Sequence, residues 1–292
     1  MSQSAAVRRS VDHYFVPEPS RFPIIGSVAL LLFGFGAAAW MNRVPGGPWV
    51  FFAGVACFFY MLFGWFGQVV RESESGQYGH RVDKSFRWSM GWFIFSEVMF
   101  FAAFFGALFY ARVLSVPWLS SGDNEALLWQ GFSGAWPTSG PYLPSGADPF
   151  TPMGAWGIPA INTMLLLTSG ATLTWAHYGL LKDKRSQLKL GLILTIALGL
   201  IFICLQAYEY VHAYADLNLR MSSGIYGSTF FLLTGFHGLH VTIGAIMLLV
   251  MLFRVMAGHF TRERHFGFEA AAWYWHFVDV VWLILFVVVY WL

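Results

Sequence analysis

Charged side chains are scarce in this sequence. Lys, Arg, Asp and Glu together make up only 11% of the 292 residues, whereas 57% are hydrophobic; an average soluble domain has about 25% charged residues. The net charge of +2 is small, and no basic patch is interleaved with aromatic residues in the way that nucleic-acid binding requires. The composition therefore predicts an integral membrane protein without a nucleic-acid partner.

Cysteine and the common catalytic motifs are also rare or missing. Cys57 and Cys204 each lie in an apolar run without a CxxC pattern, so the sequence predicts neither a disulfide nor a metal site built on cysteine. No GxxxxGK[ST], GxGxxG, GxSxG or HExxH motif stands in a suitable context, which argues against nucleotide hydrolysis and the common hydrolase mechanisms. The N-terminal segment does not read as a cleaved signal.

Long apolar runs, in contrast, are frequent. A helix needs about 20 mostly apolar residues to cross the hydrocarbon core of a bilayer. We therefore predict an all-α integral membrane protein, and the sixth of its runs is long enough to tilt or to extend into water. The seven predicted transmembrane helices lie at residues 24–41, 48–70, 88–112, 158–181, 189–214, 224–256 and 268–292.

The distribution of Lys and Arg predicts the orientation. With a cytoplasmic N-terminus, only Arg43, Arg112 and Arg220 of the 17 basic residues fall on the outer side, as the positive-inside rule requires. The first two spans carry no buried charge, whereas the last five carry carboxylates and imidazoles. A groove between the two groups is plausible. The predicted divisions are an N-terminal cytoplasmic segment 1–23, a two-helix unit 24–70, a cytoplasmic loop 71–87, and a five-helix unit 88–292 with an external loop 114–157.

Glu97 stands near the middle of the third span, in MGWFIFSEVMFFAAFFGALFYA. An ionised carboxylate that faced lipid at this depth would be costly. Glu97 must therefore be protonated, paired, or turned toward other helices or water. Three roles fit it: a proton-exchanging group, a counter-ion, or a protonated acid bonded to a neighbouring helix.

Two further helix faces carry titratable side chains. His237 and His240 share one face of the sixth span, and interhelical hydrogen bonding is favoured over metal or haem ligation because no second His or Cys set appears. In the seventh span, Glu269, His276 and Asp279 lie within an arc of about 80°. They form either a proton relay or, as we favour, a polar seam against neighbouring helices or a partner chain.

Basic and aromatic residues gather at the predicted inner interface, in WFGQVVRESESGQYGHRVDKSFRW. Arg can bind a phosphate with two hydrogen bonds, and Trp anchors at the level of the lipid headgroups. Phospholipid headgroup binding and a general role of these charges in setting the topology fit equally well. The sequence likewise does not decide whether the outer loop is an ordered cap or a flexible insertion.

Five segments together resemble subunit III of cytochrome c oxidase: SEVMFFAAFF, NTMLLLTSGATLTWAHYGL, QAYEYVHAY, SGIYGSTFFLLTGFHGLHVTIG and HFGFEAAAWYWHFVDVVWLILFVVVYW. The resemblance covers nearly all of residues 60–292 apart from the outer loop. It implies seven helices, split two plus five around a V-shaped, lipid-filled cleft and packed against subunit I. It also implies that this chain has no catalytic centre and binds no haem or copper, which subunits I and II hold.

The resemblance further implies a role in a complex that passes electrons from cytochrome c to oxygen and pumps protons. There this subunit would stabilise subunit I, hold phospholipids and support proton uptake. Since the outer loop is longer than in animal mitochondrial members, we expect a protein of the bacterial inner membrane with a cytoplasmic N-terminus and a periplasmic C-terminus.

Single positions carry over from the family as well. Glu97 matches a buried carboxylate that reacts with carbodiimides. The aromatic pair that lines the cleft has Phe as its second member here instead of Trp, which weakens a headgroup hydrogen bond at that position. The expected phospholipid contacts are Trp65, Phe66, Arg71, Glu72, His80 and Arg254.

Two alternative functions remain. The equivalent subunit of a quinol oxidase would have five spans, without the first two, so seven spans favour the cytochrome c enzyme. A free-standing proton-coupled transporter would use Glu97 and the polar seam as its relay. Such a transporter should have inverted repeats or broken helices, and none are visible in the sequence.

Overall fold

The structure, a computed structural model, describes residues 15–141 and 149–292, and within these ranges the chain forms helices and no strand. The prediction of an all-α membrane protein is confirmed. The predicted segment 1–23 and the outer loop 114–157 lie partly outside the described residues. The long helices are α2 (Phe22–Met41), α3 (Gly47–Glu74), α4 (His80–Phe109), α6 (Ile158–Leu181), α7 (Arg185–Ala215), α8 (Ile225–Met256) and α9 (Phe266–Leu285).

The number of clear membrane spans differs from the prediction. In the described part of the chain, six helices are long and apolar enough to cross a membrane, and α6 is not among them. Its 24 residues suffice in length, but five Ser and Thr side chains, an Asn and a His lower its hydropathy. The hydroxyls bond within the helix, as Thr163 does to the Pro159 carbonyl at 2.9 Å and Thr174 to the Gly170 carbonyl at 3.0 Å.

Shorter elements follow two of the long helices. The π-helical turn η1 (Tyr110–Ser115) and α5 (Val116–Leu119) continue α4, and η3 (Phe286–Trp291) continues α9. The π-helical turn η2 (Asn124–Leu128) lies in the outer loop, and η3 is π-helical as well. The chain divides into two compact units, Met1–Arg87 and Trp88–Leu292.

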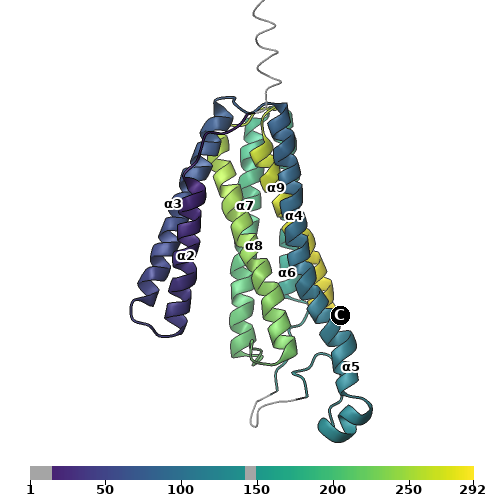
Figure 1. The fold of residues 1–292 in the computed structure, drawn as a ribbon. Coiled ribbons are helices and arrows are strands. Elements are labelled where there is room, and N and C mark those ends of the chain that lie inside the picture. The colour runs from purple at the N-terminus through teal and green to yellow at the C-terminus, as the bar shows by residue number, and fades with distance from the viewer. Residues whose placement is uncertain (1–14, 142–148) are drawn as a thin grey trace, which may run out of the picture. The chain divides into compact units, whose positions relative to one another are not determined.

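In the first unit, α2 and α3 form a closely packed hairpin (Figure 1). Each begins with a proline in its first turn, where the missing N–H is not needed. Glycines allow the two backbones to approach, because a Cβ atom at Gly36 would overlap the backbone of Phe51 and one at Gly54 would lie 2.5 Å from the Phe33 nitrogen. This close packing is what small residues provide between membrane helices.

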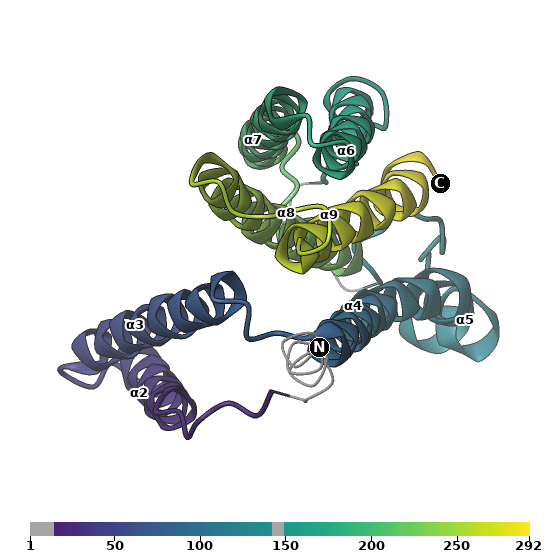
Figure 2. The same ribbon diagram turned by 90° about the horizontal axis from the view of Figure 1, so that it is seen from above.

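In the second unit, α8 and α9 lie between the α6–α7 pair on one side and α4 on the other (Figure 2). Trp275 and Trp282 of α9 are almost fully buried in this bundle. Their indole N–H groups donate to hydroxyls of α6, Trp275 to Ser169 at 2.9 Å and Trp282 to Thr163 at 3.0 Å. The hydroxyl side chains of α6 thus serve as acceptors for the indole N–H groups of α9.

Replacing Ser169 by alanine should destabilise this unit by about 1–3 kcal/mol, because the buried Trp275 N–H would lose its acceptor. The measurement is the midpoint of heat-induced unfolding in detergent, followed by tryptophan fluorescence. The control is Thr168→Val, since the Thr168 hydroxyl is exposed and bonds to the Met164 carbonyl of its own helix. Equal midpoints for the two variants would contradict the assigned hydrogen bond.

Candidate functional site

Glu97 has a specific partner in the structure. Its Oε2 lies 2.9 Å from Nε2 of His240, which stands 143 residues later on α8. The two side chains are only 21% and 10% exposed, respectively. The carboxyl therefore points into the second unit and meets a polar group there, as a carboxyl inside a membrane requires.

The other ring nitrogen of His240 fixes how the proton is shared. Nδ1 lies 2.6 Å from the Phe236 carbonyl oxygen, which can only accept, so Nδ1–H is the donor. Nε2 then either accepts from a protonated Glu97 or, on an imidazolium ring, donates to the carboxylate. In both states one proton lies between Oε2 and Nε2, and the pair is neutral as a whole.

Aromatic rings surround this pair. The ring centroids of Phe100, Phe101 and Tyr274 lie 5.7, 4.9 and 6.4 Å from that of His240. These rings come from α4 and α9, so the imidazole is held from both sides. The low polarity of this shell strengthens the hydrogen bond between Glu97 and His240.

His237 faces a different helix from His240. Its Nε2 donates to the Val278 carbonyl of α9 at 3.1 Å, and its fully buried ring packs against Phe202 and Trp282. The two imidazoles therefore serve different contacts, one to α9 and one to α4. Within residues 15–141 and 149–292, no three His, Cys, Asp or Glu side chains are grouped as metal ligands.

The three titratable residues of α9 do not meet at one point. Glu269 lies in the first turn of the helix, with its Oε2 3.7 Å from Nε2 of His265. His276 and Asp279 both lie against Gly170 of α6, where an added Cβ atom would be 2.9 Å from Oδ2 of Asp279. The absence of a side chain at Gly170 therefore leaves room for this carboxyl and imidazole between α6 and α9.

The aromatic pair of α3 is on the surface of its unit. The rings of Trp65 and Phe66 stack with centroids 5.7 Å apart and an interplanar angle of 22°, and the residues are 49% and 57% exposed. Arg71 is exposed near the end of the same helix, and His80 is exposed at the start of α4.

Glu72 is engaged in its own loop. Its carboxylate accepts hydrogen bonds from Gln68 Nε2 at 2.7 Å and from the Tyr78 hydroxyl at 2.6 Å. Burial, and then the neighbouring carboxylate, raise the pKa of Tyr78 well above its ordinary value, so the hydroxyl stays protonated and donates. Glu72 thus fixes the turn between α3 and α4.

Arg254 packs on the turn between α8 and α9. Its guanidinium lies 4.2 Å from the ring centroid of Phe260, within the range of a cation–π contact, and its Nε donates to His259 Nδ1 at 3.4 Å. Arg185, at the start of α7, donates to the carbonyls of His259 and Phe260 at 2.9 and 2.6 Å. Two arginines therefore hold this turn.

Three buried polar residues, Asn162, Gln206 and Glu209, are not among the site residues chosen from the sequence. Glu209 is completely buried on α7, and its Oε1 accepts from the Tyr290 hydroxyl at 2.6 Å. Its Oε2, and both amide atoms of the buried Gln206 and Asn162, have no hydrogen-bond partner in the described part of the chain. The spacing of Gln206 and Glu209, three residues apart inside an apolar run, is the signal that could have identified them.

The sequence was compared with known proteins. The family model described as "Cytochrome c oxidase subunit III" matches residues 12–292. Cytochrome c oxidase subunit 3 of Neotragus moschatus is 41% identical over 281 residues, which cover 95% of this chain and 96% of the relative. The same subunit of Marchantia polymorpha is 42% identical over 279 residues, with 95% and 96% coverage. The chain therefore belongs to the cytochrome c oxidase subunit III family.

Proposed function

We propose that this chain acts within cytochrome c oxidase as a scaffold that stabilises subunit I, holds phospholipids and supports proton uptake, without carrying electrons itself. The Glu97–His240 hydrogen bond is the main support for this proposal. A carboxyl that is bonded to an imidazole inside the bundle, behind a shell of aromatic rings, suits a structural contact better than an open path for ions. In this proposal the haem and copper belong to subunits I and II, and cytochrome c docks on the complex.

The test is removal of this chain from the purified oxidase. We expect the remaining complex to keep its haem and copper and its initial rate of electron transfer, while proton uptake during turnover slows. The separated chain should show no haem absorption and no bound copper. Stoichiometric metal in the separated chain, or an unchanged rate of proton uptake in the remaining complex, would contradict the proposal.

We assign the polar residues of the last four long helices to contacts between helices. His237 and His240 support this role through their contacts with α9 and α4, and His276 and Asp279 through their position against α6. Glu269 would complete the seam at the start of α9. No feature of α7 or α8 favours a transporter, since each is a continuous helix. The presence of α2 and α3 favours the cytochrome c enzyme over a quinol oxidase, for which we expect five spans.

We also propose a bacterial inner-membrane location, with the N-terminus in the cytoplasm and the C-terminus in the periplasm. The distribution of Lys and Arg and the long outer loop support this proposal. The chain itself is a multi-pass membrane protein. Because the relatives named above are eukaryotic, the orientation applies equally to a mitochondrial inner membrane, with the matrix in place of the cytoplasm.

The exposed end of α3 is the proposed phospholipid site of the first unit. Arg71 would bind the phosphate, and the exposed Trp65–Phe66 stack would cover the acyl chains. Glu72 and His80 would contribute to this phospholipid site indirectly, because they lie at the turn between α3 and α4. Arg254, in the second unit, would make a separate headgroup contact through the outer edge of its guanidinium, since that group already packs on Phe260.

The double variant Trp65→Leu/Arg71→Gln should lose bound phospholipid. Loss of one charge-assisted hydrogen bond costs about 1.5–3 kcal/mol. This corresponds to phospholipid binding that is weaker by about tenfold or more. Mass spectrometry of lipids that co-purify with the complex measures the loss. The control is Trp49→Leu, because Trp49 is 81% exposed at the other end of α3. An unchanged lipid content in the double variant would contradict the assignment.

A further inference from the structure

A groove opens between α7 and α8 in the second unit. It has a volume of about 240 Å³, and its shape follows from the glycines of α8. A Cβ atom at Gly238 would meet nothing within 4 Å, and one at Gly235 would lie 3.3 Å from the Tyr210 hydroxyl. Most of the groove wall is apolar, and its polar side chains are Gln206, Tyr210, Thr234 and Thr242.

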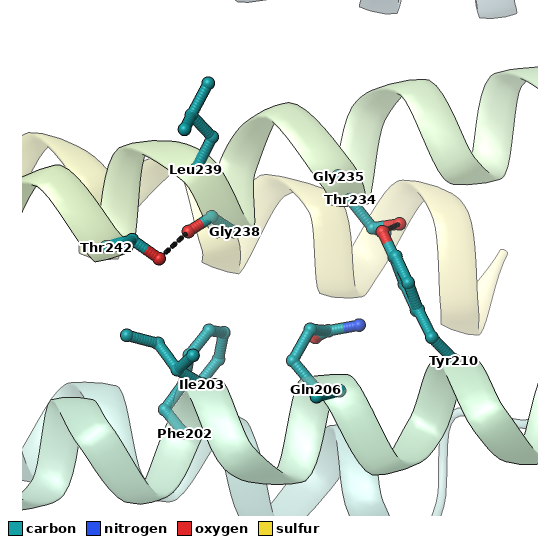
Figure 3. A pocket seen from close by; sticks show the side chains of 10 residues that line it. Phe202, Ile203, Gln206, Tyr210, Thr234, Gly235, Gly238, Leu239 and Thr242 are labelled. Atoms are coloured by element: carbon teal, nitrogen blue, oxygen red, sulfur yellow. Dashed lines mark hydrogen bonds between the residues drawn. The ribbon is translucent and has the colours of Figure 1, made fainter. Parts of the chain in front are cut away.

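The Gln206 amide points into this groove. Figure 3 shows its side chain projecting from α7 toward α8, between Ile203 and Tyr210. Gln206 is only 6% exposed, and neither its Oε1 nor its Nε2 has a hydrogen-bond partner among residues 15–141 and 149–292. Because an amide buried without a partner is strongly unfavourable, such groups in folded proteins are almost always bonded to protein or to ordered water.

The neighbouring hydroxyls show which lone pairs remain available. The Thr234 hydroxyl donates to the Phe230 carbonyl at 2.7 Å, so in the 2.7 Å contact between Thr234 and Tyr210 the Tyr210 hydroxyl is the donor. The Tyr210 oxygen therefore still has an acceptor position beside Gln206. Thr242 already donates to the Gly238 carbonyl at 2.8 Å.

Glu209 adds a second incomplete group next to the groove. It follows Gln206 by one turn of α7, and its carboxyl faces the Gln206 amide in a contact that falls outside hydrogen-bond geometry. Oε1 accepts from Tyr290, whereas Oε2 is buried without a partner in the described chain. A protonated Oε2 needs an acceptor and an ionised one needs a donor, and a molecule that both donates and accepts satisfies whichever state is present.

We propose that this groove binds a cluster of water molecules, which bond to the Gln206 amide and the Tyr210 hydroxyl and extend to Oε2 of Glu209. Water both donates and accepts, and 240 Å³ is enough space for roughly eight molecules at about 30 Å³ each. A lipid acyl chain would fill the apolar wall but leave the amide unpaired. The groove is therefore a hydrated site within the membrane-spanning part of the subunit.

The direct test is a structure of the intact oxidase complex at a resolution at which ordered water is visible. We expect water bonded to both Oε1 and Nε2 of Gln206, and a continuous chain of water from there to Glu209. Acyl-chain density, a side chain of another subunit in the groove, or an empty groove would each overturn the proposal.

The variant Gln206→Leu gives an independent test, because the dissociation temperature shifts in opposite directions for a hydrated and a dry groove. If the groove holds water, the substitution removes the anchor of the cluster and isolates Glu209, so heat-induced dissociation of this subunit from the complex shifts to lower temperature. If the groove is dry, leucine replaces an unpaired buried amide and shifts the dissociation upward. No shift or an upward shift overturns the proposal. The control is Thr168→Val, which lies outside the groove, has an exposed hydroxyl bonded to the Met164 carbonyl, and should leave the transition in place.

Discussion

Replacing His240 by leucine should destabilise the subunit by about 2–4 kcal/mol, because the Glu97 carboxyl would remain inside the membrane without its partner. The expected result is dissociation of the subunit from the purified oxidase at a lower temperature, followed by size-exclusion chromatography after heating. Glu97→Gln should change the transition far less. Its amide N–H can donate to His240 Nε2 in the way that a protonated Glu97 does.

The double variant Glu97→Leu/His240→Leu completes the comparison. Replacing both partners of a buried hydrogen bond by apolar groups is often nearly neutral, so we expect it to recover part of the stability that His240→Leu loses. Collapse of the complex in Glu97→Gln would instead show that the carboxylate charge is required. In that case the pair is an ion pair, and the neutral acid is the wrong description.

The sequence was sufficient to predict that Glu97 needs a partner, but it did not identify His240. The argument for a partner uses only local information, namely one carboxyl inside a long apolar run. The choice of His240 depends on how α4 lies against α8, which brings together residues 143 positions apart. Periodicity gives the face of each helix and not the neighbour that the face meets.

The differences at α6 and α7 have a related cause. The sequence predicted a span at 158–181, where α6 forms, but hydropathy counts Thr, Ser and Asn as polar wherever they occur. The hydroxyls of α6 nevertheless bond to their own backbone and to the tryptophans of α9. Gln206 and Glu209 of α7 also lie in an apolar run and were not chosen as site residues. Their importance appears only when burial and missing partners are known.

The glycines of the α2–α3 hairpin lead to a prediction with a matched control on one helix. Gly36→Ala should separate the hairpin, because the new Cβ would overlap the Phe51 backbone, and overpacking of this kind costs about 1–3 kcal/mol. Gly34→Ala, two residues earlier, should be neutral or stabilising, since a Cβ there meets nothing within 4 Å and alanine favours the helix by about 1 kcal/mol.

Cys57 reports on this packing, because its thiol lies on α3 at 3.9 Å from the Ile25 carbonyl of α2. With the exposed Cys204 replaced by alanine, the rate of maleimide labelling of Cys57 in detergent should rise in Gly36→Ala and stay low in Gly34→Ala. Backbone cannot move aside as a flexible side chain can, so the added methyl group must displace α3 itself. Equal labelling rates in the two variants would mean that the hairpin accommodates the added methyl group without separating. The close approach of the α2 and α3 backbones at Gly36 would then be contradicted.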